Sequence, residues 1–388
     1  MKTIAFSFLF VALASDAAIA QSDSSDHAYT GFKVAGGQSD ATTFPGPDIG
    51  AKVNSAYRVA SASSTIPTIY IPAGNYTYST DMVFGGPVTL RCEPGTVLNY
   101  AGTNYAVKLG PDGLTVSNYN PLPYTVNGCQ FTGGARAVVG IFVNEFVVKS
   151  YVDEVMFMRF GGTSTWALWY QGSNWDARVD KLYVWLGNTN GIYQNAADPA
   201  NPVNGDYGQS HLYVLNSHIQ GSGQGIYLNG FNSIVDNTNL SMANGPSIQL
   251  GGWANGAVLQ NVYMERTAGS APCVAYGDGA NSPRAKNLIS LVSVKGIYCN
   301  PHNKDFHTSA GVIAPTTGTS RISNWTLESV VASSDTLPGT PLVVQNDLNG
   351  QSGNTATSVF GPAPLHTTGR NIEAWSGLAG DAGAPPRQ

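Results

Sequence analysis

Residues 212–228 read LYVLNSHIQGSGQGIYL, and this stretch decides the fold. A short apolar strand and a polar corner lead into a second short strand, and a glycine-rich loop then leads into a third. The same succession recurs from about residue 150 to residue 330, with equivalent strands roughly 21 to 38 residues apart. Self-similarity at an irregular spacing of this size is typical of a solenoid, in which each coil buries its apolar face against its neighbours.

Two sets of three-residue strands can be aligned from coil to coil. The first set occupies residues 155–157, 182–184, 217–219, 238–240, 262–264, 292–294 and 325–327. The second set occupies residues 168–170, 192–194, 226–228, 248–250, 274–276 and 312–314. Strands this short bury no core alone, but in a parallel coil each lies about 4.8 Å from the equivalent strand of the next turn. The sequence therefore predicts an all-β fold, a right-handed parallel β-helix.

Asparagine recurs directly before the first strand set. It is found at Asn216, Asn237, Asn261 and Asn324, and Leu291 takes the remaining place. Amides that stack in a turn can hydrogen-bond from coil to coil, which favours an asparagine ladder. Asparagine is also a good turn residue for local reasons, so that alternative stays open.

Composition fits many short strands and tight turns. Glycine accounts for 45 of 388 residues, and only 11% of residues are charged. The net charge of −5 and the absence of a basic run argue against nucleic acid or an anionic membrane as the partner. We expect no cofactor and no metal site.

The first twenty residues have the features of a secretory signal peptide. Lys2 supplies a positive start, residues 4–14 are apolar, and small residues at positions 18 and 20 precede Gln21. No later segment is long enough for a membrane span. We therefore expect a secreted protein, either extracellular or periplasmic.

The remaining chain divides by composition. We predict a signal peptide at 1–20, a flexible polar segment at 21–43, a parallel β-helix domain at 44–334, and a C-terminal cap or tail at 335–388. An oxidising compartment favours disulfides over a zinc site for the four cysteines, and no pair has metal-ligand spacing. Sequential bonds, Cys92 to Cys129 and Cys273 to Cys299, are the favoured arrangement, although four cysteines allow three pairings.

A short helix is expected at the start of the β-helix domain. Apolar residues from Ile49 to Ala60 recur at helical spacing, and Asp48 is available as an N-cap. The sequences IYIPAGNY at 69–76 and VTLRCEPGTVLNY at 88–100 follow it. A capping helix before these two segments resembles the N-terminal part of the pectate-lyase-like superfamily, which includes phage tailspike depolymerases.

The resemblance implies the fold but not a reaction. The superfamily is implied to contain lyases, glycoside hydrolases, epimerases, fructan-cyclising enzymes and adhesins. The segment at 188–190 reads Asn-Thr-Asn and lacks the carboxylate of the polygalacturonase motif, and the Arg-x-Pro-x-x-Arg arrangement of calcium-dependent pectate lyases is absent. Both specific assignments are therefore set aside.

Alternate positions of the first strand set should face outward and form columns. One predicted column contains Met156, Tyr183, His218, Asn239, Tyr263, Ser293 and Thr326, and the next contains Met158, Trp185, Gln220, Ser241, Glu265, Lys295 and Glu328. Aromatic faces stack on sugar rings, and flanking acids can protonate a glycosidic oxygen. We therefore predict substrate-binding roles for Tyr183, Trp185, Tyr263 and Lys295.

Glu265 and Glu328 are the first candidates for catalysis. Two coils apart in the predicted column, their backbones would be roughly 9 to 10 Å apart, near the upper end of the ~6.5–9.5 Å carboxyl separations of inverting glycosidases. The alternative is a solvated charge ladder, because Lys295 stands between the two acids. His218 is a candidate base.

Asp153, Asp180 and Asp236 form a rival acidic column at the corner before the strand. We favour a structural role for them as turn caps. If they instead share a groove with Glu265, crowding of like charges would raise the pKa of one carboxyl, and Asp236 with Glu265 would then be the pair to test.

Trp169, Tyr193 and Tyr227 occupy successive outward positions of the second strand set. They could form a further sugar platform, or the tail after residue 335 could cover them as core. The sequence leaves both open.

The function predicted from these features is action on a polysaccharide or oligosaccharide, with hydrolysis by a carboxylate pair as the leading mechanism. A first alternative is β-elimination on a uronate-containing glycan, with Tyr263 or His218 as base and Lys295 neutralising the acid. A second is a non-catalytic glycan-binding or surface-structural protein.

Overall fold

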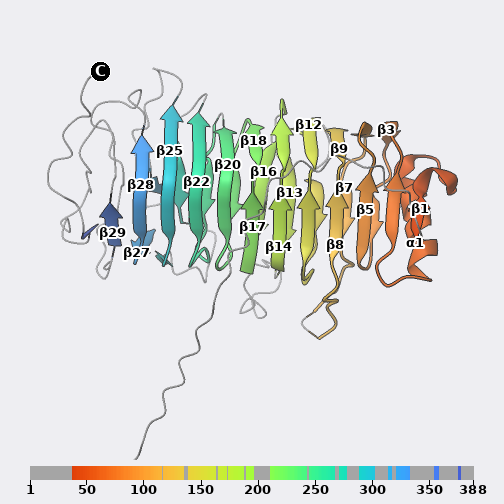
Figure 1. The fold of residues 1–388 in the computed structure, drawn as a ribbon, viewed down its shortest axis with the longest axis horizontal. Coiled ribbons are helices and arrows are strands. Elements are labelled where there is room, and N and C mark those ends of the chain that lie inside the picture. Colours follow the sequence, from red (N-terminus) through yellow and green to blue (C-terminus); the bar gives the residue numbers. More distant parts are fainter. Residues whose placement is uncertain are drawn as a thin grey trace, which may run out of the picture. The chain divides into compact units, whose positions relative to one another are not determined.

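The computed structural model describes residues 37–115, 117–134, 139–162, 165–172, 174–187, 189–195, 210–242, 244–266, 271–277, 288–301, 313–316, 320–332, 354–357 and 375–376. Over these residues the strands of successive coils lie side by side in a row, from α1 at one end to β29 at the other (Figure 1). All pairings between the described strands are parallel, and α1 is the only α-helix described. The predicted fold class, an all-β right-handed parallel β-helix with a short capping helix, is confirmed. The predicted signal peptide lies outside the described residues.

The larger sheet has nineteen strands. They are β1 (Gln38–Asp40), β2 (Thr68–Ile71), β3 (Gly74–Tyr78), β5 (Val88–Cys92), β6 (Thr96–Tyr100), β8 (Tyr124–Asn127), β9 (Gln130–Gly133), β11 (Ser150–Asp153), β12 (Met156–Phe160), β14 (Trp175–Asp180), β15 (Tyr183–Trp185), β17 (Ser210–Leu215), β18 (His218–Gly221), β20 (Ile234–Met242), β22 (Val258–Arg266), β25 (Ser293–Pro301), β28 (Thr326–Ala332), β29 (Asn354–Thr357) and β30 (Trp375–Ser376). Most coils contribute two short strands to this sheet, and in β20, β22, β25 and β28 the two are continuous.

The second sheet has nine strands and contains the predicted second strand set. Its members are β4 (Met82–Phe84), β7 (Tyr105–Leu109), β10 (Val139–Val143), β13 (Trp166–Gln171), β16 (Asn190–Asn195), β19 (Ile226–Leu228), β21 (Ile248–Leu250), β23 (Val274–Tyr276) and β26 (Ile313–Pro315). The predicted alignment holds from Leu168 to Val274, but Val274 pairs with Ile313 and not with residue 312. A third, two-stranded sheet joins β24 (Leu288–Ser290) to β27 (Arg321–Ser323).

A corner residue with positive φ separates the two halves of each coil in the large sheet. Asn216, Asn237 and Asn261 occupy this corner in successive coils, with φ of 49°, 46° and 52°. Asparagine tolerates the left-handed region better than most residues, because its short amide can hydrogen-bond locally. The Asn237 Nδ2 donates to Asn216 Oδ1 over 2.8 Å, so this rung of the predicted ladder is confirmed.

The predicted ladder is wrong beyond Asn261. Leu291 and Asn324 sit at a different corner, one short strand earlier in the coil, in line with Gly256. The corner opposite Asn261 is instead Gly296, because Val262 pairs with Ile297. The prediction therefore slipped by five residues between β22 and β25.

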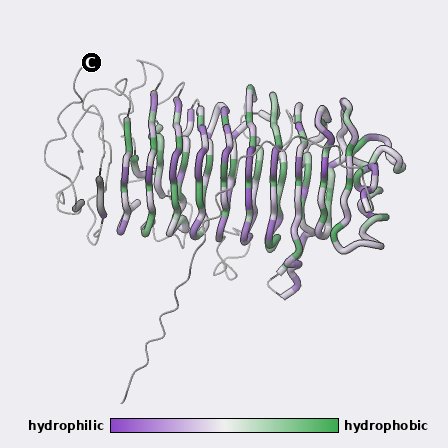
Figure 2. The backbone as a smooth tube through the Cα atoms, in the orientation of Figure 1, coloured by the Kyte–Doolittle hydropathy of each residue, from purple (hydrophilic) through white to green (hydrophobic). Residues whose placement is uncertain are grey.

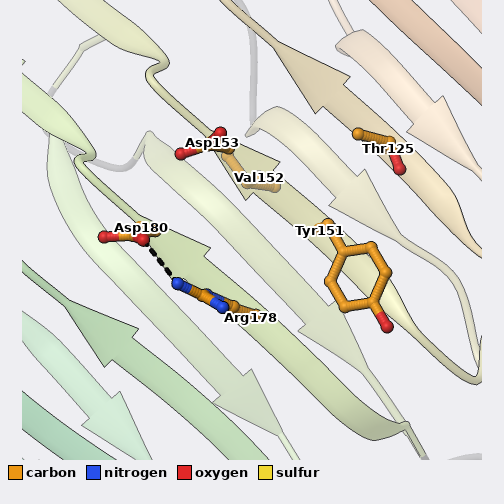
Figure 3. Close-up of a pocket in the computed structure, with 6 residues that line it drawn as sticks. All are labelled: Thr125, Tyr151, Val152, Asp153, Arg178 and Asp180. Carbon is orange, nitrogen blue, oxygen red and sulfur yellow. Dashed lines mark hydrogen bonds and ion pairs between the residues drawn. The ribbon is translucent and has the colours of Figure 1, made fainter. Parts of the chain in front are cut away.

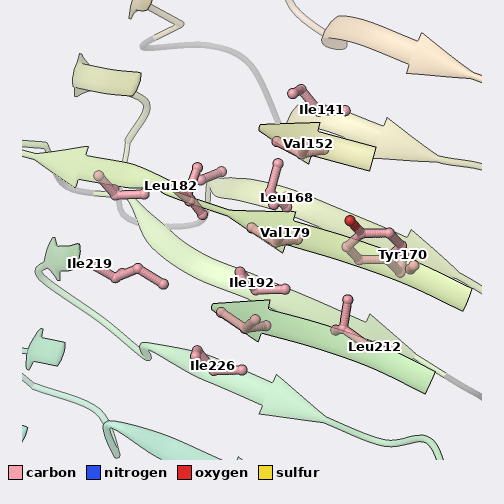
Figure 4. Packing of buried hydrophobic residues seen from close by; sticks show 14 of the residues in the cluster. Ile141, Val152, Leu168, Tyr170, Val179, Leu182, Ile192, Leu212, Ile219 and Ile226 are labelled. Carbon is pink, nitrogen blue, oxygen red and sulfur yellow. The ribbon is translucent and has the colours of Figure 1, made fainter. Parts of the chain in front are cut away.

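The core consists of columns of apolar side chains inside the coils (Figure 4). Hydrophobic and hydrophilic residues follow one another along the strands of each coil (Figure 2). One column follows the register of the large sheet through Val152, Val179, Val214, Val235, Leu259, Val294 and Leu327, all fully buried. Burying one such side chain contributes about 1.5–3 kcal/mol. The alternate residues of the same strands face outward, which makes the outer face a set of columns as well.

Helix α1 (Ile49–Ser61) covers the N-terminal end of the coils, as predicted. Asp48 caps it by accepting a hydrogen bond from the Ala51 N–H over 2.9 Å. Asn54 pairs with the edge strand β4: its Oδ1 accepts from the Val83 N–H and its Nδ2 donates to the Asp81 carbonyl, each over 2.8 Å. The helix thereby provides hydrogen-bond partners for two backbone groups at the β4 edge of the sheet, which could otherwise pair with a strand of another chain.

Order begins earlier than predicted. The 3₁₀ helix η1 (Ala41–Thr43) and strand β1 lie within the segment 21–43 that we expected to be flexible. Gln38 pairs with Thr68 of β2, and Asp40 caps η1 by accepting from the Thr42 N–H. Both predicted disulfides, Cys92–Cys129 and Cys273–Cys299, are formed.

Candidate functional site

A groove on the outer face of the large sheet contains two of the four predicted sugar-contacting residues, Tyr183 and Tyr263. We call it the aromatic groove; it is lined by Tyr183, Asn216, Ser217, His218, Asn237, Thr238, Asn239, Asn261 and Tyr263. Its volume is about 270 Å³. The register runs from Tyr183 to His218, to Asn239 and to Tyr263 in successive coils. This part of the predicted column is confirmed.

The rings of the column form two stacks. Tyr183 and His218 have centroids 5.3 Å apart and planes 12° apart, and Tyr263 and Tyr298 have centroids 5.5 Å apart and planes 10° apart. Asn239 separates the two stacks. Tyr183 is 44% exposed. The groove therefore offers aromatic surface to a ligand, interrupted by one amide.

Trp185 extends this surface to the next outward position of β15, where it is 41% exposed and pairs with Met158. In the same file of positions, Ser241 precedes Glu265 and Asn300 follows it. Ser241 Oγ donates to Glu265 Oε2 over 3.3 Å, and Asn300 Nδ2 donates to the Tyr263 hydroxyl over 3.0 Å. Glu265 thus lies beside the aromatic groove, close enough for its charge to act on His218.

Lys295 and Glu328 do not lie beside Glu265, which corrects the prediction. Lys295 pairs with Gln260 on one side and with Glu328 on the other. Its Nζ lies 3.3 Å from Glu328 Oε1. Glu265 is five residues beyond Gln260, on the order of 15 Å along the strand. The predicted carboxyl pair of Glu265 and Glu328 therefore has no geometric basis.

Asp236 is likewise separated from Glu265. It pairs with Gln260, on the other side of the corner, and accepts a hydrogen bond from Asn261 Nδ2 over 3.0 Å. The slip at β25 does not affect this pair, because β20 and β22 pair as predicted, and that register puts Asp236 and Glu265 on opposite sides of the Asn237 and Asn261 corner. Asp236 belongs to the column that continues to Lys295 and Glu328.

His218 is the titratable base of the groove. Burial lowers the pKa of its imidazole, and the charge of Glu265 opposes that effect in part. The ring is therefore neutral near pH 7, when one nitrogen can donate and the other can accept a hydrogen bond.

A second hollow lies on the preceding half of the coil of β14 and β15 and of the two coils before it (Figure 3). We call it the acidic pocket; it is lined by Thr125, Tyr151, Val152, Asp153, Arg178 and Asp180, with a volume of about 390 Å³. Asp153 and Asp180 are direct partners across β11 and β14, so their side chains leave the sheet on the same face. Figure 3 shows the Asp180 carboxylate joined to Arg178, with Asp153 near Asp180 on the adjacent strand.

The two carboxylates have different surroundings. Asp180 accepts from Arg178 Nη2 over 2.7 Å and from Asn216 Nδ2 over 2.9 Å. Asp153 accepts from Asn127 Nδ2 over 3.1 Å. Burial raises the pKa of Asp153, and the nearby charges of Glu154 and Asp180 raise it further. Two carboxyls whose environments differ in this way are suited to acid and base roles.

Asn216 connects the two hollows. It lines the aromatic groove, and its amide donates to Asp180 of the acidic pocket. Arg178, Tyr298 and Asn300 were not among the residues predicted from the sequence. Correct alignment of Tyr298 with Tyr263 would have found the last two, whereas Arg178 alternates with Asp180 on β14 and could have been read from that strand.

The aromatic residues of the nine-stranded sheet form a stack of their own. Trp169 and Tyr193 have centroids 4.5 Å apart, and Tyr193 and Tyr227 have centroids 4.8 Å apart. Tyr227 is 9% exposed, so this stack is partly core. It offers a ligand less ring surface than the aromatic groove does.

The described residues contain no group of three or more His, Cys, Asp or Glu side chains that could hold a metal ion. Among them there is also no helix of the length and apolar character needed to cross a membrane.

Comparison with known proteins identifies the fold and leaves the family open. No family model matches the sequence, and no curated protein matches it. Among solved structures, a Yersinia enterocolitica family 28 exopolygalacturonase matches with a TM-score of 0.56 and 10% identity, over 87% of this chain and 78% of that chain. The A-module of the Azotobacter vinelandii mannuronan C-5 epimerase AlgE6 matches with a TM-score of 0.54 and 11% identity, over 85% and 96%.

A protein of Geobacillus virus E2, ORF18, matches with a TM-score of 0.50 and 14% identity. That match covers 86% of this chain but 60% of the viral chain. Identities this low show a shared fold and no shared activity. The chain thus shares the right-handed parallel β-helix fold with these proteins, and this is the fold that the resemblance in its sequence implied.

Proposed function

We propose that this protein is a secreted, carbohydrate-active protein that binds a glycan chain in the aromatic groove. The observation that carries the proposal is the column of Tyr183, His218, Asn239 and Tyr263, in which rings and an amide lie in register on one outer face. Ring faces stack on the C–H faces of sugars, and amides exchange hydrogen bonds with sugar hydroxyls. The exopolygalacturonase and the mannuronan epimerase among the structural neighbours add support for a glycan ligand.

The reaction we propose is hydrolysis of a glycosidic bond by Asp153 and Asp180. Their strands are adjacent, so their backbones are about 4.8 Å apart, which suits the ~5–5.5 Å carboxyl separation of retaining glycosidases better than the wider separation of inverting ones. Asp153, with its raised pKa, is the proton donor. Asp180, whose charge Arg178 stabilises over 2.7 Å, is the nucleophile.

The proposed hydrolysis has two displacement steps at the anomeric carbon. Asp153 protonates the leaving glycosidic oxygen while Asp180 attacks the anomeric carbon, and the bond from that carbon to the leaving oxygen breaks. Asp153 then takes a proton from water, whose oxygen displaces Asp180 from the anomeric carbon. The sugar keeps its anomeric configuration, and both carboxyls return to their starting protonation states.

Glu265 with His218 is the rival catalytic pair. His218 lines the aromatic groove, and Glu265 lies beside it, where its charge raises the pKa of His218. One carboxylate and one neutral imidazole fit proton abstraction better than glycoside hydrolysis. The elimination alternative also relied on Lys295, which is paired with Glu328 outside the groove. Hydrolysis by the acidic pocket is therefore the stronger proposal.

The test measures reducing ends released from a polysaccharide panel, together with ultraviolet absorbance of unsaturated uronates. Hydrolysis gives new ends without absorbance, elimination gives both, and binding alone gives neither. Asp153→Asn and Asp180→Asn should each reduce release at least a hundredfold while leaving glycan affinity within about threefold of the wild type. Glu265→Gln is the matched comparison, and loss of turnover in that variant alone would move the chemistry into the aromatic groove.

A further inference from the structure

The interruption of the aromatic column at Asn239 creates a slot between two rings. His218 and Tyr263 are partners of Asn239 on either side. Two inter-strand steps of about 4.8 Å place their backbones roughly 9.6 Å apart. Tyr183 stacks on His218 from the far side, and Tyr298 stacks on Tyr263 from its far side. Each wall of the slot is therefore a ring supported from behind.

The width of the slot matches one saturated ring. Carbon atoms in contact lie about 3.5–4.0 Å apart, so a ring seated between two aromatic faces needs about 7–8 Å between them. A separation of roughly 9.6 Å allows one such ring and is too narrow for two. Asn239, the shortest side chain of the column from Tyr183 to Tyr298, forms the floor.

The floor has an unused polar atom. The Oδ1 of Asn239 is buried and has no hydrogen-bond partner among the described residues. A buried acceptor without a partner costs about 1–3 kcal/mol, and a turn of the Asn239 amide that brings Oδ1 to a ligand hydroxyl would recover that loss. The adjoining corners add the amides of Asn237 and Asn261 to the lining.

The surroundings of the slot carry negative charge. The lining of the aromatic groove includes no lysine or arginine. Glu265 lies two residues beyond Tyr263, and Asp236 accepts a hydrogen bond from Asn261 of the lining. The nearby cation Lys181, two residues before Tyr183, is paired with Glu154 over 2.8 Å. A uronate or sulfated sugar would therefore meet these carboxylates, and like charges in partly buried sites repel strongly.

We propose that the slot between His218 and Tyr263 binds a single uncharged pyranose ring edge-on, with Asn239 accepting a hydrogen bond from one of its hydroxyls. This inference rests on the proposed glycan-binding function and adds the substrate class. It predicts a neutral glycan, unlike the charged uronates expected of a polygalacturonase-like groove. The recognised ring is one unit of a chain, a side branch or a chain end.

The experiment compares the full-length wild type with Asn239→Tyr. The new ring would continue the stack from His218 to Tyr263 and fill the slot. Ser293→Tyr is the matched control, since Ser293 also faces outward from the large sheet but lies across from Val258 and Thr326, outside the groove. The probes are neutral oligosaccharides and the same oligosaccharides oxidised at C6 to uronates, measured by calorimetry.

We expect the neutral oligosaccharide to bind the wild type at least tenfold more tightly than its oxidised form. We expect Asn239→Tyr to weaken neutral binding at least tenfold, with Ser293→Tyr unchanged. Competition by the free monosaccharide on the wild type provides a second readout that depends on no variant. Unchanged affinity in a folded Asn239→Tyr protein, or no competition by the monosaccharide, would overturn the slot.

Tighter binding of the oxidised form would overturn the prediction that the ligand is uncharged, but not the slot itself. If the wild type binds neither form across the panel, the proposed glycan-binding function itself fails. The outcomes thus separate failure of the slot from failure of the function on which it rests.

Discussion

Tyr263 lies opposite Tyr298 across β22 and β25, with ring planes 10° apart. The pair closes one end of the aromatic column, and Asn300 holds it by donating to the Tyr263 hydroxyl over 3.0 Å. Because Tyr298 is 37% exposed and supports Tyr263 from outside the groove, the two residues should contribute unequally to binding.

The first prediction concerns this pair. Tyr263→Ala removes a wall of the groove and should weaken glycan affinity by about 1–2 kcal/mol, or roughly tenfold, since base and sugar stacking terms are of this size. Tyr298→Ala should cost less than half as much. Calorimetric titration of both variants with the glycan that the wild type binds best is the measurement. Equal losses would show that Tyr298 contacts the ligand directly.

Trp185 provides a second prediction at the same surface. It is 41% exposed at the outward position after Tyr183, so Trp185→Ala should weaken binding severalfold without changing the melting temperature by more than about 1 °C. Leu186→Ala, at a neighbouring residue that is 51% exposed, is the control. Unchanged affinity in Trp185→Ala would move the glycan path away from β15.

The third prediction is a pH dependence. Burial lowers the pKa of His218 in the folded protein, so the unfolded chain binds its proton more tightly. Stability from this group is therefore complete above the unfolded pKa of about 6.5 and is lost as the pH falls toward the folded value. His218→Gln should flatten the stability curve as the pH falls below about 6.5. Chemical denaturation at several pH values checks this, and an unchanged slope would contradict it.

The aromatic column shows how far sequence reasoning reaches. The alternation of apolar and polar residues from Tyr183 to Tyr263 was sufficient to predict one outward column. In each of these coils the corner residue is asparagine or lysine, and the outward residue follows two positions later. The helix, its Asp48 cap and both disulfides were predictable for similarly local reasons.

The failure at β25 also has a physical cause. Each long strand consists of two alternating halves joined at a corner, and the halves look alike in sequence. Leu291 and Asn324 also precede short apolar strands and also have positive φ, so in sequence they resemble the corner residue Asn261. The residue that truly pairs with that corner is Gly296, which adopts positive φ without a side-chain amide. Pairing in space decides between the two registers, and the sequence of one coil does not contain that information.

Gly296 gives the fourth prediction. Its φ of 62° matches the asparagines of the preceding coils, and a Cβ there would lie 3.1 Å from Asn261 Oδ1. Gly296→Asn should be more stable than Gly296→Ala by about 0.5–1 kcal/mol, because asparagine tolerates this conformation and its amide can donate to Asn261. Denaturant unfolding of the two variants measures the difference. Equal stability would mean that the amide ladder adds nothing at this coil.

The fifth prediction concerns the N-terminal cap. Asn54→Ala removes two hydrogen bonds to the strand segment at Asp81 and Val83, and should cost about 1–3 kcal/mol. Val59→Ala on the exposed side of the same helix is the control, since Val59 is 62% exposed. Thermal melting and light scattering are the measurements. Equal melting temperatures for the two variants would show that the hydrogen bonds of Asn54 do not stabilise the N-terminal edge of the sheet.

The register of the coils has a consequence for how specificity can change. Each turn of the solenoid delivers one side chain to each file, so a single substitution alters one subsite and leaves the interior of the neighbouring turns as it was. Gain or loss of a whole turn by recombination between loops would lengthen or shorten the binding surface by one inter-strand step, and with it the length of glycan that is bound. In such a scaffold the number of subsites and the specificity of each subsite can therefore change independently.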